Sequence, residues 1–300
     1  MGTLNLSEGF IPFGDKHAVK YEKFVFSGGE PHIKIDKSSF DLLAGSQVAI
    51  SIRINNFVDL GFLCLAVDAI RRLRLDIKID AFIPYFPAAR QDRAMVPGEP
   101  LSVKVYADIV NSLNLHNVTI FDPHSEVTPA LLNNCRVLDN HRLVTNAIVS
   151  AKLRGFHLVS PDAGSNKKIK DLGKALSVSP NVESFDIINC DKTRNTKTGD
   201  LTGFKVYSDD LEGKSCIIVD DICDGGGTFI GLAEELEIKN AGNLYLVVSH
   251  GIFSKGFREL AKHFKQVFTT DSIVNNYAWD IPEIEKKSEI VQMFKFKDLW

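Results

Sequence analysis

Residues 215–228 read SCIIVDDICDGGGT, and this segment decides the fold. The apolar run 216–219 has the length and the branched side chains of a buried strand. Two acidic residues, Asp220 and Asp221, follow the run, and Asp224 stands before three glycines and a threonine. The pattern of residues 228–240 then predicts a helix. A strand that passes through a glycine loop into a helix is typical of an α/β protein with a parallel sheet.

The glycine loop has the composition of a phosphate-binding site. Glycines allow a close backbone approach, and N–H groups at a helix N-terminus bind anions. Asp220 and Asp221 supply acceptors for the vicinal hydroxyls of a sugar, or ligands for a bridging cation. The segment lacks both the Gly-Lys-Ser/Thr end of a P-loop and the Gly-x-Gly-x-x-Gly spacing of a dinucleotide-binding fold. We predict a pocket for a phosphorylated sugar; the alternative is a glycine-rich turn with capping aspartates.

Outward from this segment, short apolar runs alternate with helical patterns along most of the chain. The predicted strands are residues 47–53, 77–84, 118–122, 155–160, 184–189, 215–220 and 242–249. The predicted helices are residues 60–75, 101–114, 165–176, 228–240 and 257–264. This alternation predicts parallel sheets covered by helices on both faces. The 300 residues are enough for two domains, which we expect at residues 1–145 and 146–300.

Composition excludes several classes of partner. Lys and Arg number 35 against 38 Asp and Glu, a net charge of −3, so the chain lacks the basic footprint of a nucleic-acid binder. The longest apolar stretch, residues 62–67, is far shorter than the roughly 20 residues of a membrane helix. The first residues lack the pattern of a secretory signal, and the five scattered cysteines form no Cys-x-x-Cys pair. We therefore predict a cytoplasmic protein with neither nucleic-acid nor membrane partners.

Segment 215–228 resembles the phosphoribosyl-diphosphate signature shared by type I phosphoribosyltransferases and ribose-phosphate diphosphokinases. The resemblance implies that Asp220 and Asp221 bind the ribose hydroxyls. It also implies that the 5-phosphate is bound by Asp224, Gly225, Gly226, Gly227 and Thr228. A second stretch, Pro161-Asp162-Ala163-Gly164, is similar to the family's Pro-Asp-x-Gly and implies that Asp162 lies near the ribose.

Motifs in the first half favour the diphosphokinases. Residues 89–93, Ala-Arg-Gln-Asp-Arg, resemble the family's nucleotide loop, which implies that ATP is bound by Arg90, Gln91 and Asp92. The sequence Asp122-Pro123-His124 is similar to the family's Asp-Leu-His and implies that His124 lies beside the triphosphate and its Mg²⁺.

Residues 24–30 resemble the stretch that meets adenine in the partner subunit's site. This resemblance adds Phe26 and Glu30 to the ATP-binding set. It also implies a homo-oligomer whose nucleotide site is shared between subunits.

Residues 190–194, Cys-Asp-Lys-Thr-Arg, resemble the family's flexible catalytic loop. Phosphoryl transfer depends mainly on positioning and on neutralising the charge of the migrating group. The resemblance therefore implies a catalytic set of Lys192, Arg194 and His124.

The resemblance runs from about residue 20 to residue 275, which is most of the chain. It therefore implies a fold, a reaction and a cofactor for the chain as a whole. The expected fold is two tandem phosphoribosyltransferase-like, Rossmann-like domains, with a nucleotide side at 1–145 and a phosphoribosyl side at 146–300. The expected reaction transfers the β,γ-diphosphoryl group of ATP to ribose 5-phosphate, giving phosphoribosyl diphosphate and AMP. Mg²⁺ is the expected cofactor, with His124, Asp162 and Asp139 as its ligands.

The sequence also departs from the family pattern. Gly28 stands where the family usually has Asp or Asn at the adenine edge, which predicts weaker discrimination of ATP from GTP. Asn133 and Asn134 fall near an expected metal-binding carboxylate, which favours Asp139 as the ligand.

Two other functions stay open at this point. A type I phosphoribosyltransferase would leave the first-half motifs unexplained. A non-catalytic regulatory homologue is favoured by the departures just described and disfavoured by Lys192, Arg194 and His124.

Overall fold

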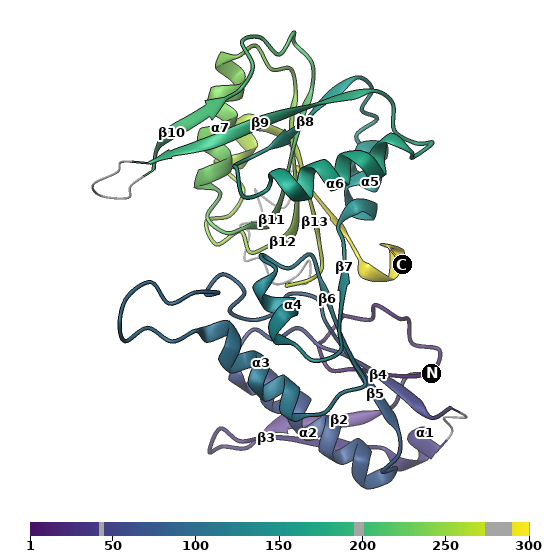
Figure 1. Ribbon diagram of the computed structural model, residues 1–300. Coiled ribbons are helices and arrows are strands. Elements are labelled where there is room, and N and C mark those ends of the chain that lie inside the picture. Colours follow the sequence, from purple (N-terminus) through teal and green to yellow (C-terminus); the bar gives the residue numbers. More distant parts are fainter. Residues whose placement is uncertain (42–44, 195–200, 274–289, 300) are drawn as a thin grey trace. The chain divides into compact units, whose positions relative to one another are not determined.

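Strand β11 (Cys216–Cys223) lies at the centre of a seven-stranded sheet in the computed structural model, which describes residues 1–41, 45–194, 201–273 and 290–299 (Figure 1). Residues 216–219 are all buried, as the apolar run predicts. The chain divides into two units. Unit 1 consists of residues 1–139 and 295–298, and unit 2 consists of residues 140–294 with Leu299.

Unit 2 contains the seven-stranded sheet. Its strand order is β10 (Leu201–Val206), β9 (Phe185–Arg194), β8 (Phe156–Ser160), β11, β12 (Leu244–Gly251), β13 (Phe264–Thr270) and β14 (Val291–Phe294). All neighbours are parallel except the β9–β10 pair. The helices of this unit are α5 (His141–Ser150), α6 (Asn166–Ser177), α7 (Gly227–Ile238) and α8 (Leu260–His263). They pack on the sheet through apolar stripes such as Ile169, Leu172 and Leu176 of α6.

Unit 1 contains a five-stranded parallel sheet. Its strand order is β1 (Gly2–Asn5), β4 (Gln47–Ser51), β5 (Lys78–Ile83), β6 (Asn117–Phe121) and β7 (Cys135–Leu138). The helices are α1 (Lys37–Asp41), α2 (Phe57–Leu73), α3 (Ser102–Ser112) and α4 (Val127–Leu131). A separate antiparallel hairpin, β2 (Tyr21–Val25) and β3 (Pro31–Ile35), packs against α2.

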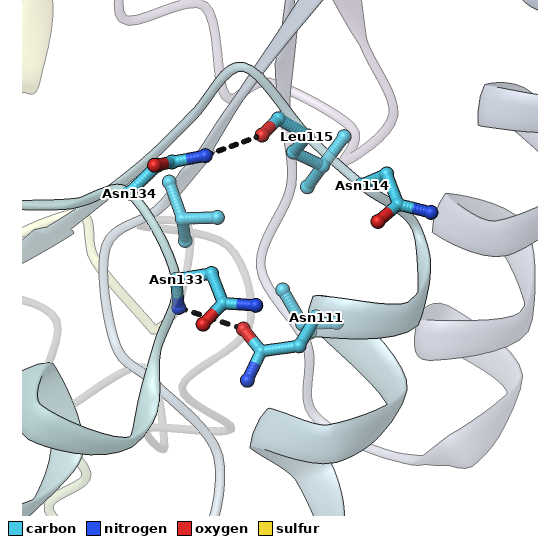
Figure 2. Close-up of a pocket in the computed structure, with 7 residues that line it drawn as sticks. Asn111, Asn114, Leu115, Asn133 and Asn134 are labelled. Atoms are coloured by element: carbon cyan, nitrogen blue, oxygen red, sulfur yellow. Dashed lines mark hydrogen bonds between the residues drawn. The ribbon is translucent and has the colours of Figure 1, made fainter.

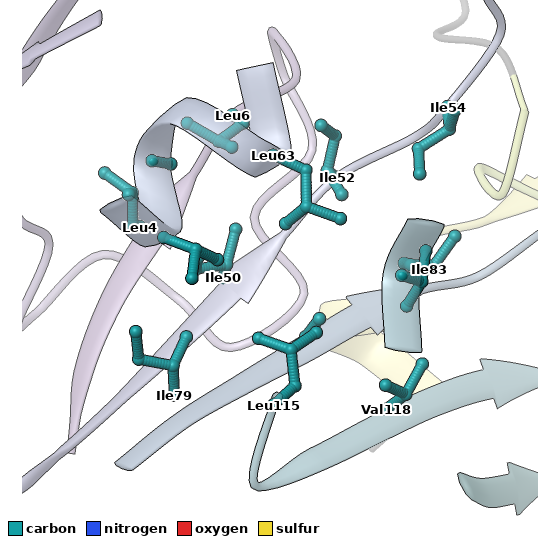
Figure 3. Close-up of a cluster of buried hydrophobic side chains, with 14 of the residues drawn as sticks. Leu4, Leu6, Ile50, Ile52, Ile54, Leu63, Ile79, Ile83, Leu115 and Val118 are labelled. Atoms are coloured by element: carbon teal, nitrogen blue, oxygen red, sulfur yellow. The ribbon is translucent and has the colours of Figure 1, made fainter. Parts of the chain in front are cut away.

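The core of unit 1 lies between its sheet and its helices. Figure 3 shows Ile50 and Ile79 from neighbouring strands beside Leu63 of α2. All three side chains are at most 1% exposed. Asn56 caps α2 by accepting the N–H groups of Val58 and Asp59, which fixes where this helix begins.

A short C-terminal helix, α9 (Phe296–Leu299), brings an aromatic ring into the core of unit 1. Phe296 is 2% exposed, and its ring lies 6.0 Å from Phe10, 5.1 Å from Phe82 and 5.0 Å from Phe121. Unit 1 is therefore built from two segments that are distant in the sequence.

The α/β fold class is confirmed, and two local predictions are wrong. Only residues 260–263 of the predicted helix 257–264 are helical, because Phe264 begins β13. Residues 190–194 were predicted as a loop but continue β9, since β10 pairs with them as far as Arg194. The division at Asp139 also differs from the expected boundary at 145/146, which would cut through α5. None of the helices in the described ranges combines the length and apolar character needed to cross a membrane.

Candidate active site

The glycine loop joins β11 to α7. Gly226 has a φ of +77°, a left-handed conformation that favours glycine, and its carbonyl accepts the N–H groups of Phe229 and Ile230 at 3.0 Å. The first N–H groups of a helix have no intrahelical acceptor. Those of Gly227 and Thr228 could thus donate to an anion, and their role in binding a phosphate stays a prediction.

Asp220 and Asp221 lie in the second half of β11, two residues before its end at Cys223. The N–H of Asp221 donates to Oδ1 of Asp220 at 2.9 Å, and Asp221 is only 8% exposed. Burial and the neighbouring charge of Asp221 raise the pKa of Asp220 well above its usual range, with a smaller contribution from Asp162. A hydroxyl donor or a cation next to the pair would therefore stabilise the ionised form of Asp220.

Asp162 follows strand β8 and is paired with Lys192 of β9. The Lys192 ammonium donates to Oδ2 of Asp162 at 2.5 Å, and the N–H of Ser165 donates to Oδ1 at 3.0 Å. Burial acts to raise the pKa of Asp162, but the hydrogen bond and charge of Lys192 outweigh it and hold the pKa below the usual value.

The structure thus brings together side chains from three neighbouring strands of unit 2. The strands β9, β8 and β11 are adjacent, and Lys192, Asp162 and Asp220 come from their carboxyl ends. The side chain of Arg194, the other predicted catalytic residue, lies outside the described part of the chain.

In unit 1, the Arg-Gln-Asp-Arg loop meets the Asp-x-His segment at the carboxyl ends of β5 and β6. The Asp92 side chain is only 7% exposed, lies 3.4 Å from Arg93 and accepts a hydrogen bond from the Ser125 side chain. Burial acts to raise the pKa of Asp92, but these hydrogen bonds and the charges of Arg93 and His124 hold it below the usual value. Arg90 and Gln91 are exposed on the same loop, and Gln91 donates its N–H to the carbonyl of Ala88 at 2.8 Å.

Phe26 and Glu30 lie on the turn of the β2–β3 hairpin. The N–H of Phe26 donates to the carbonyl of Glu30 at 2.9 Å, and the Phe26 ring packs 4.8 Å from Phe24 and 5.7 Å from His32. A Cβ added at Gly28 would lie 2.5 Å from a carboxylate oxygen of Glu30. The hairpin is a separate sheet, so within one subunit it does not extend the edge that carries Asp92 and His124.

Asn133 and Asn134 lie at the opposite end of the unit 1 sheet from His124, directly before β7. They line a pocket of about 130 Å³ together with Asn111 and Asn114 (Figure 2). Asn133 donates its N–H to Oδ1 of Asn111 at 2.8 Å, and the Asn134 side chain donates to the carbonyl of Leu115 at 3.1 Å. The sequence position where the family pattern would have a metal-binding carboxylate therefore lies away from the segment that carries His124.

Asp139 follows the carboxyl end of β7, beside the end of β6. The N–H of Asp122 donates to the carbonyl of Leu138 at 2.8 Å, which brings this end of β7 to the segment that carries His124. Within the described ranges, no three His, Cys, Asp or Glu side chains form a group able to hold a metal ion. The expected ligands His124, Asp139 and Asp162 are divided between the two units, and their joint role stays a prediction.

Three serines support these side chains and were not predicted. Ser125 binds Asp92, Ser165 binds Asp162, and Ser254 donates to Asp224 at 2.6 Å. Ser165 stands three residues after Asp162, the usual spacing of a local turn contact, and this spacing is a signal that sequence reasoning could have used.

Comparison with known proteins gives the family. Residues 143–282 match the phosphoribosyl transferase domain family. The ribose-phosphate pyrophosphokinase of Vibrio parahaemolyticus is 31% identical over 272 residues, which are 88% of this chain and 80% of that protein. The chain belongs to the ribose-phosphate pyrophosphokinase family. The enzyme of that name from Aquifex aeolicus is 30% identical over 77% of this chain and 71% of its own length.

The fold of this pyrophosphokinase family member also matches a solved structure. The crystal structure of phosphoribosylpyrophosphate synthetase from Mycobacterium smegmatis superposes with a TM-score of 0.76, at 21% identity, covering 99% of this chain and 95% of that one. An alignment over 88% of the chain is longer than unit 2 alone, so the family resemblance includes part of unit 1. A single phosphoribosyltransferase domain does not account for it.

Proposed function

We propose that the chain is a ribose-phosphate diphosphokinase, which transfers the β,γ-diphosphoryl group of ATP to the anomeric hydroxyl of ribose 5-phosphate. The products are phosphoribosyl diphosphate and AMP. The observation that carries the proposal is the pairing of Lys192 with Asp162 beside Asp220. A glycine loop and an acidic pair suit any enzyme that handles a phosphoribosyl group, whereas Lys192 adds the cation that diphosphoryl transfer needs.

Ribose 5-phosphate would bind to unit 2. Its phosphate would accept hydrogen bonds from the loop Asp224–Thr228, and its hydroxyls would donate to the carboxylates of Asp220 and Asp221. The raised pKa of Asp220 supports this assignment, because a hydroxyl donor favours the charged form of a buried carboxylate.

The transfer itself would join the anomeric oxygen to the β-phosphorus of ATP and break the bond from that phosphorus to the α,β-bridging oxygen. AMP would leave with the bridging oxygen, and the proton of the anomeric hydroxyl would be released to water. Lys192 would neutralise the charge that spreads over the migrating group, with Arg194 as the second cation. The ion pair of Lys192 with Asp162 supports this role, because it would hold the ammonium next to the proposed sugar site.

ATP would bind to unit 1 through Arg90, Gln91, Asp92 and His124, with Phe26 and Glu30 supplied by another subunit. Phe24, Val25 and Phe26 are 45%, 47% and 51% exposed, which supports a homo-oligomer in which the hairpin finds further contacts. We also infer that the enzyme is cytoplasmic, since the five cysteines are unpaired thiols.

Mg²⁺ would serve as the cofactor, bound mainly through the ATP phosphates, as is usual for this ion. We favour His124 and Asp139 as protein ligands, since both follow neighbouring strands at one edge of the unit 1 sheet. Both oxygens of Asp162 already accept hydrogen bonds, so a metal at Asp162 would share this carboxylate with the Lys192 ammonium and the Ser165 N–H. When bound, Mg²⁺ would withdraw charge from the phosphates.

The test is to incubate the purified protein with Mg²⁺, ATP and ribose 5-phosphate and to follow AMP and phosphoribosyl diphosphate by mass spectrometry. The expected result is equal amounts of both products. We predict that Lys192→Ala lowers kcat by about 100-fold or more, because an electrostatic contact to the transition state is lost.

Lys174→Ala is the matched control. Lys174 also pairs with an aspartate, Asp171 at 2.9 Å, but lies exposed on α6, and its loss should leave kcat within about twofold. Absence of AMP from protein that still binds ribose 5-phosphate would support a non-catalytic regulatory homologue instead.

A further inference from the structure

The turn after β12, residues 252–256, is fastened to the phosphate loop. The N–H groups of Ile252 and Phe253 donate to the carbonyl of Cys223 at 2.8 and 3.2 Å. Ser254 donates its N–H to the carbonyl of Asp224 at 3.1 Å and its hydroxyl to Oδ1 of the same residue at 2.6 Å. These four hydrogen bonds fix the next residue, Lys255, beside the loop.

The Lys255 side chain runs alongside Gly225. A Cβ added at Gly225 would lie 3.4 Å from both Cδ and Cε of Lys255, so the lysine stem covers this part of the loop. The ammonium is one bond beyond Cε and therefore within reach of a phosphate seated on the loop. Lys255 is exposed, and its ammonium forms no hydrogen bond or ion pair with the residues that the structure describes.

Several carboxylates lie close to the glycine loop, so a phosphate bound there would be stabilised by a nearby cation. Asp220, Asp221 and Asp224 lie within or directly before the loop, and a phosphate dianion has to approach them. The ammonium of Lys192 is already paired with Asp162. Lys255 is thus positioned to offset the repulsion between these carboxylates and the phosphate.

We propose that Lys255 binds the 5-phosphate of ribose 5-phosphate through its ammonium group. It acts as a substrate-binding residue that completes the phosphate seat formed by Asp224–Thr228. The inference rests on the proposed function, which assigns the phosphorylated sugar to this loop. It predicts that Lys255 contributes to the affinity for the sugar phosphate and contributes little to the transfer step.

The experiment compares Lys255→Met, which keeps an unbranched stem, with Lys265→Met. Lys265 is an exposed lysine near the start of β13, at the other end of the same sheet. Binding of ribose 5-phosphate without ATP is measured by calorimetry at several salt concentrations, and KM and kcat are measured for the full reaction. Lys255→Met should raise both Kd and KM for ribose 5-phosphate about tenfold, as expected for a lost charge-assisted hydrogen bond.

Further readouts separate binding from a structural role. For Lys255→Met, kcat and the thermal midpoint should stay unchanged and the salt dependence of Kd should become weaker, while Lys255→Arg should recover most of the affinity. An unchanged Kd in Lys255→Met, or an equal loss in Lys265→Met, would overturn the inference.

The binding arm also separates this inference from the proposed function. If the wild-type protein binds ribose 5-phosphate but forms no phosphoribosyl diphosphate, the proposed reaction fails, and the Kd values still decide the role of Lys255. If the wild-type protein does not bind ribose 5-phosphate, both fail.

Discussion

Asp220 and Asp221 are adjacent near the end of β11, where Asp221 is buried and Asp220 is half-buried. In the unfolded chain an aspartate ionises near pH 4, whereas burial and the charge of Asp221 raise the pKa of Asp220 in the folded protein. A raised carboxyl pKa means that ionisation costs folding free energy. This cost is absent below about pH 4, where both states are protonated, and it grows as the pH rises toward the folded pKa.

We therefore predict that Asp220→Asn stabilises the substrate-free protein at pH 7. The amide carries no charge and can still accept the N–H of Asp221. Thermal unfolding followed between pH 4 and pH 8 should show a gain in the midpoint that increases with pH and vanishes near pH 4. A gain of equal size at every pH would contradict the electrostatic explanation. The KM for ribose 5-phosphate should rise, because a hydroxyl acceptor is lost.

At this scale the sequence predicted the charged side chains that cluster in unit 2 better than the residues that hold them in place. The carboxylates Asp162 and Asp220 and the cation Lys192 belong to motifs, and the structure places Asp220 and Lys192 on β11 and β9 and Asp162 just after β8, which lies between them. Ser254 could not be predicted, because it approaches Asp224 from a turn 30 residues away. Contacts of this kind depend on which strands become neighbours.

The β2–β3 hairpin carries large apolar side chains that are exposed to solvent. Its aromatic residues Phe24 and Phe26 pack on each other and on His32 and leave about half of their surface exposed. Such rings contribute little to the core. An exposed group of aromatic rings is typical of a surface that binds a ligand or another protein.

We predict that Phe26→Ala leaves the thermal midpoint within about 2 °C of the wild type, as for most exposed positions. It should raise the KM for ATP about tenfold, because stacking on a base is lost. The matched control is Phe40→Ala. Phe40 is 1% exposed, so its loss should lower the midpoint and leave the KM for ATP unchanged. An unchanged KM in Phe26→Ala would argue against nucleotide binding by the hairpin.

Elements with a clear apolar period were predicted to within three residues, as α2 and α7 show. The short strands β7 and β14 were missed, because a strand of four residues at or near a sheet edge carries too little pattern of its own. The error at 257–264 has a different origin. Phe257, Leu260 and Phe264 are buried at helical spacing, but Phe264 belongs to a strand.

Each of the two units has its own buried core, and in unit 1 the buried Phe296 packs against Phe10, Phe82 and Phe121. We predict that Phe296→Ala destabilises unit 1 by about 3–5 kcal/mol, the usual cost of removing a buried aromatic ring. Calorimetry should show a lower thermal midpoint for the unfolding of unit 1 and an unchanged midpoint for the unfolding of unit 2. Ribose 5-phosphate should raise the midpoint of the other transition, since ligand binding stabilises the unit that holds the site.

Exposed Phe57 provides the control: it is 60% exposed, and Phe57→Ala should leave both transitions nearly in place. Equal shifts of both transitions in Phe296→Ala would show that the two units unfold together.

The return of the chain to unit 1 also has a consequence for synthesis on the ribosome. Residues 1–139 emerge first, but Phe10, Phe82 and Phe121 have no Phe296 to pack against until all of unit 2 has been translated. The first unit to be made is therefore the last to be completed. For the same reason, a single cut in the gene cannot yield two fragments that each encode one whole unit.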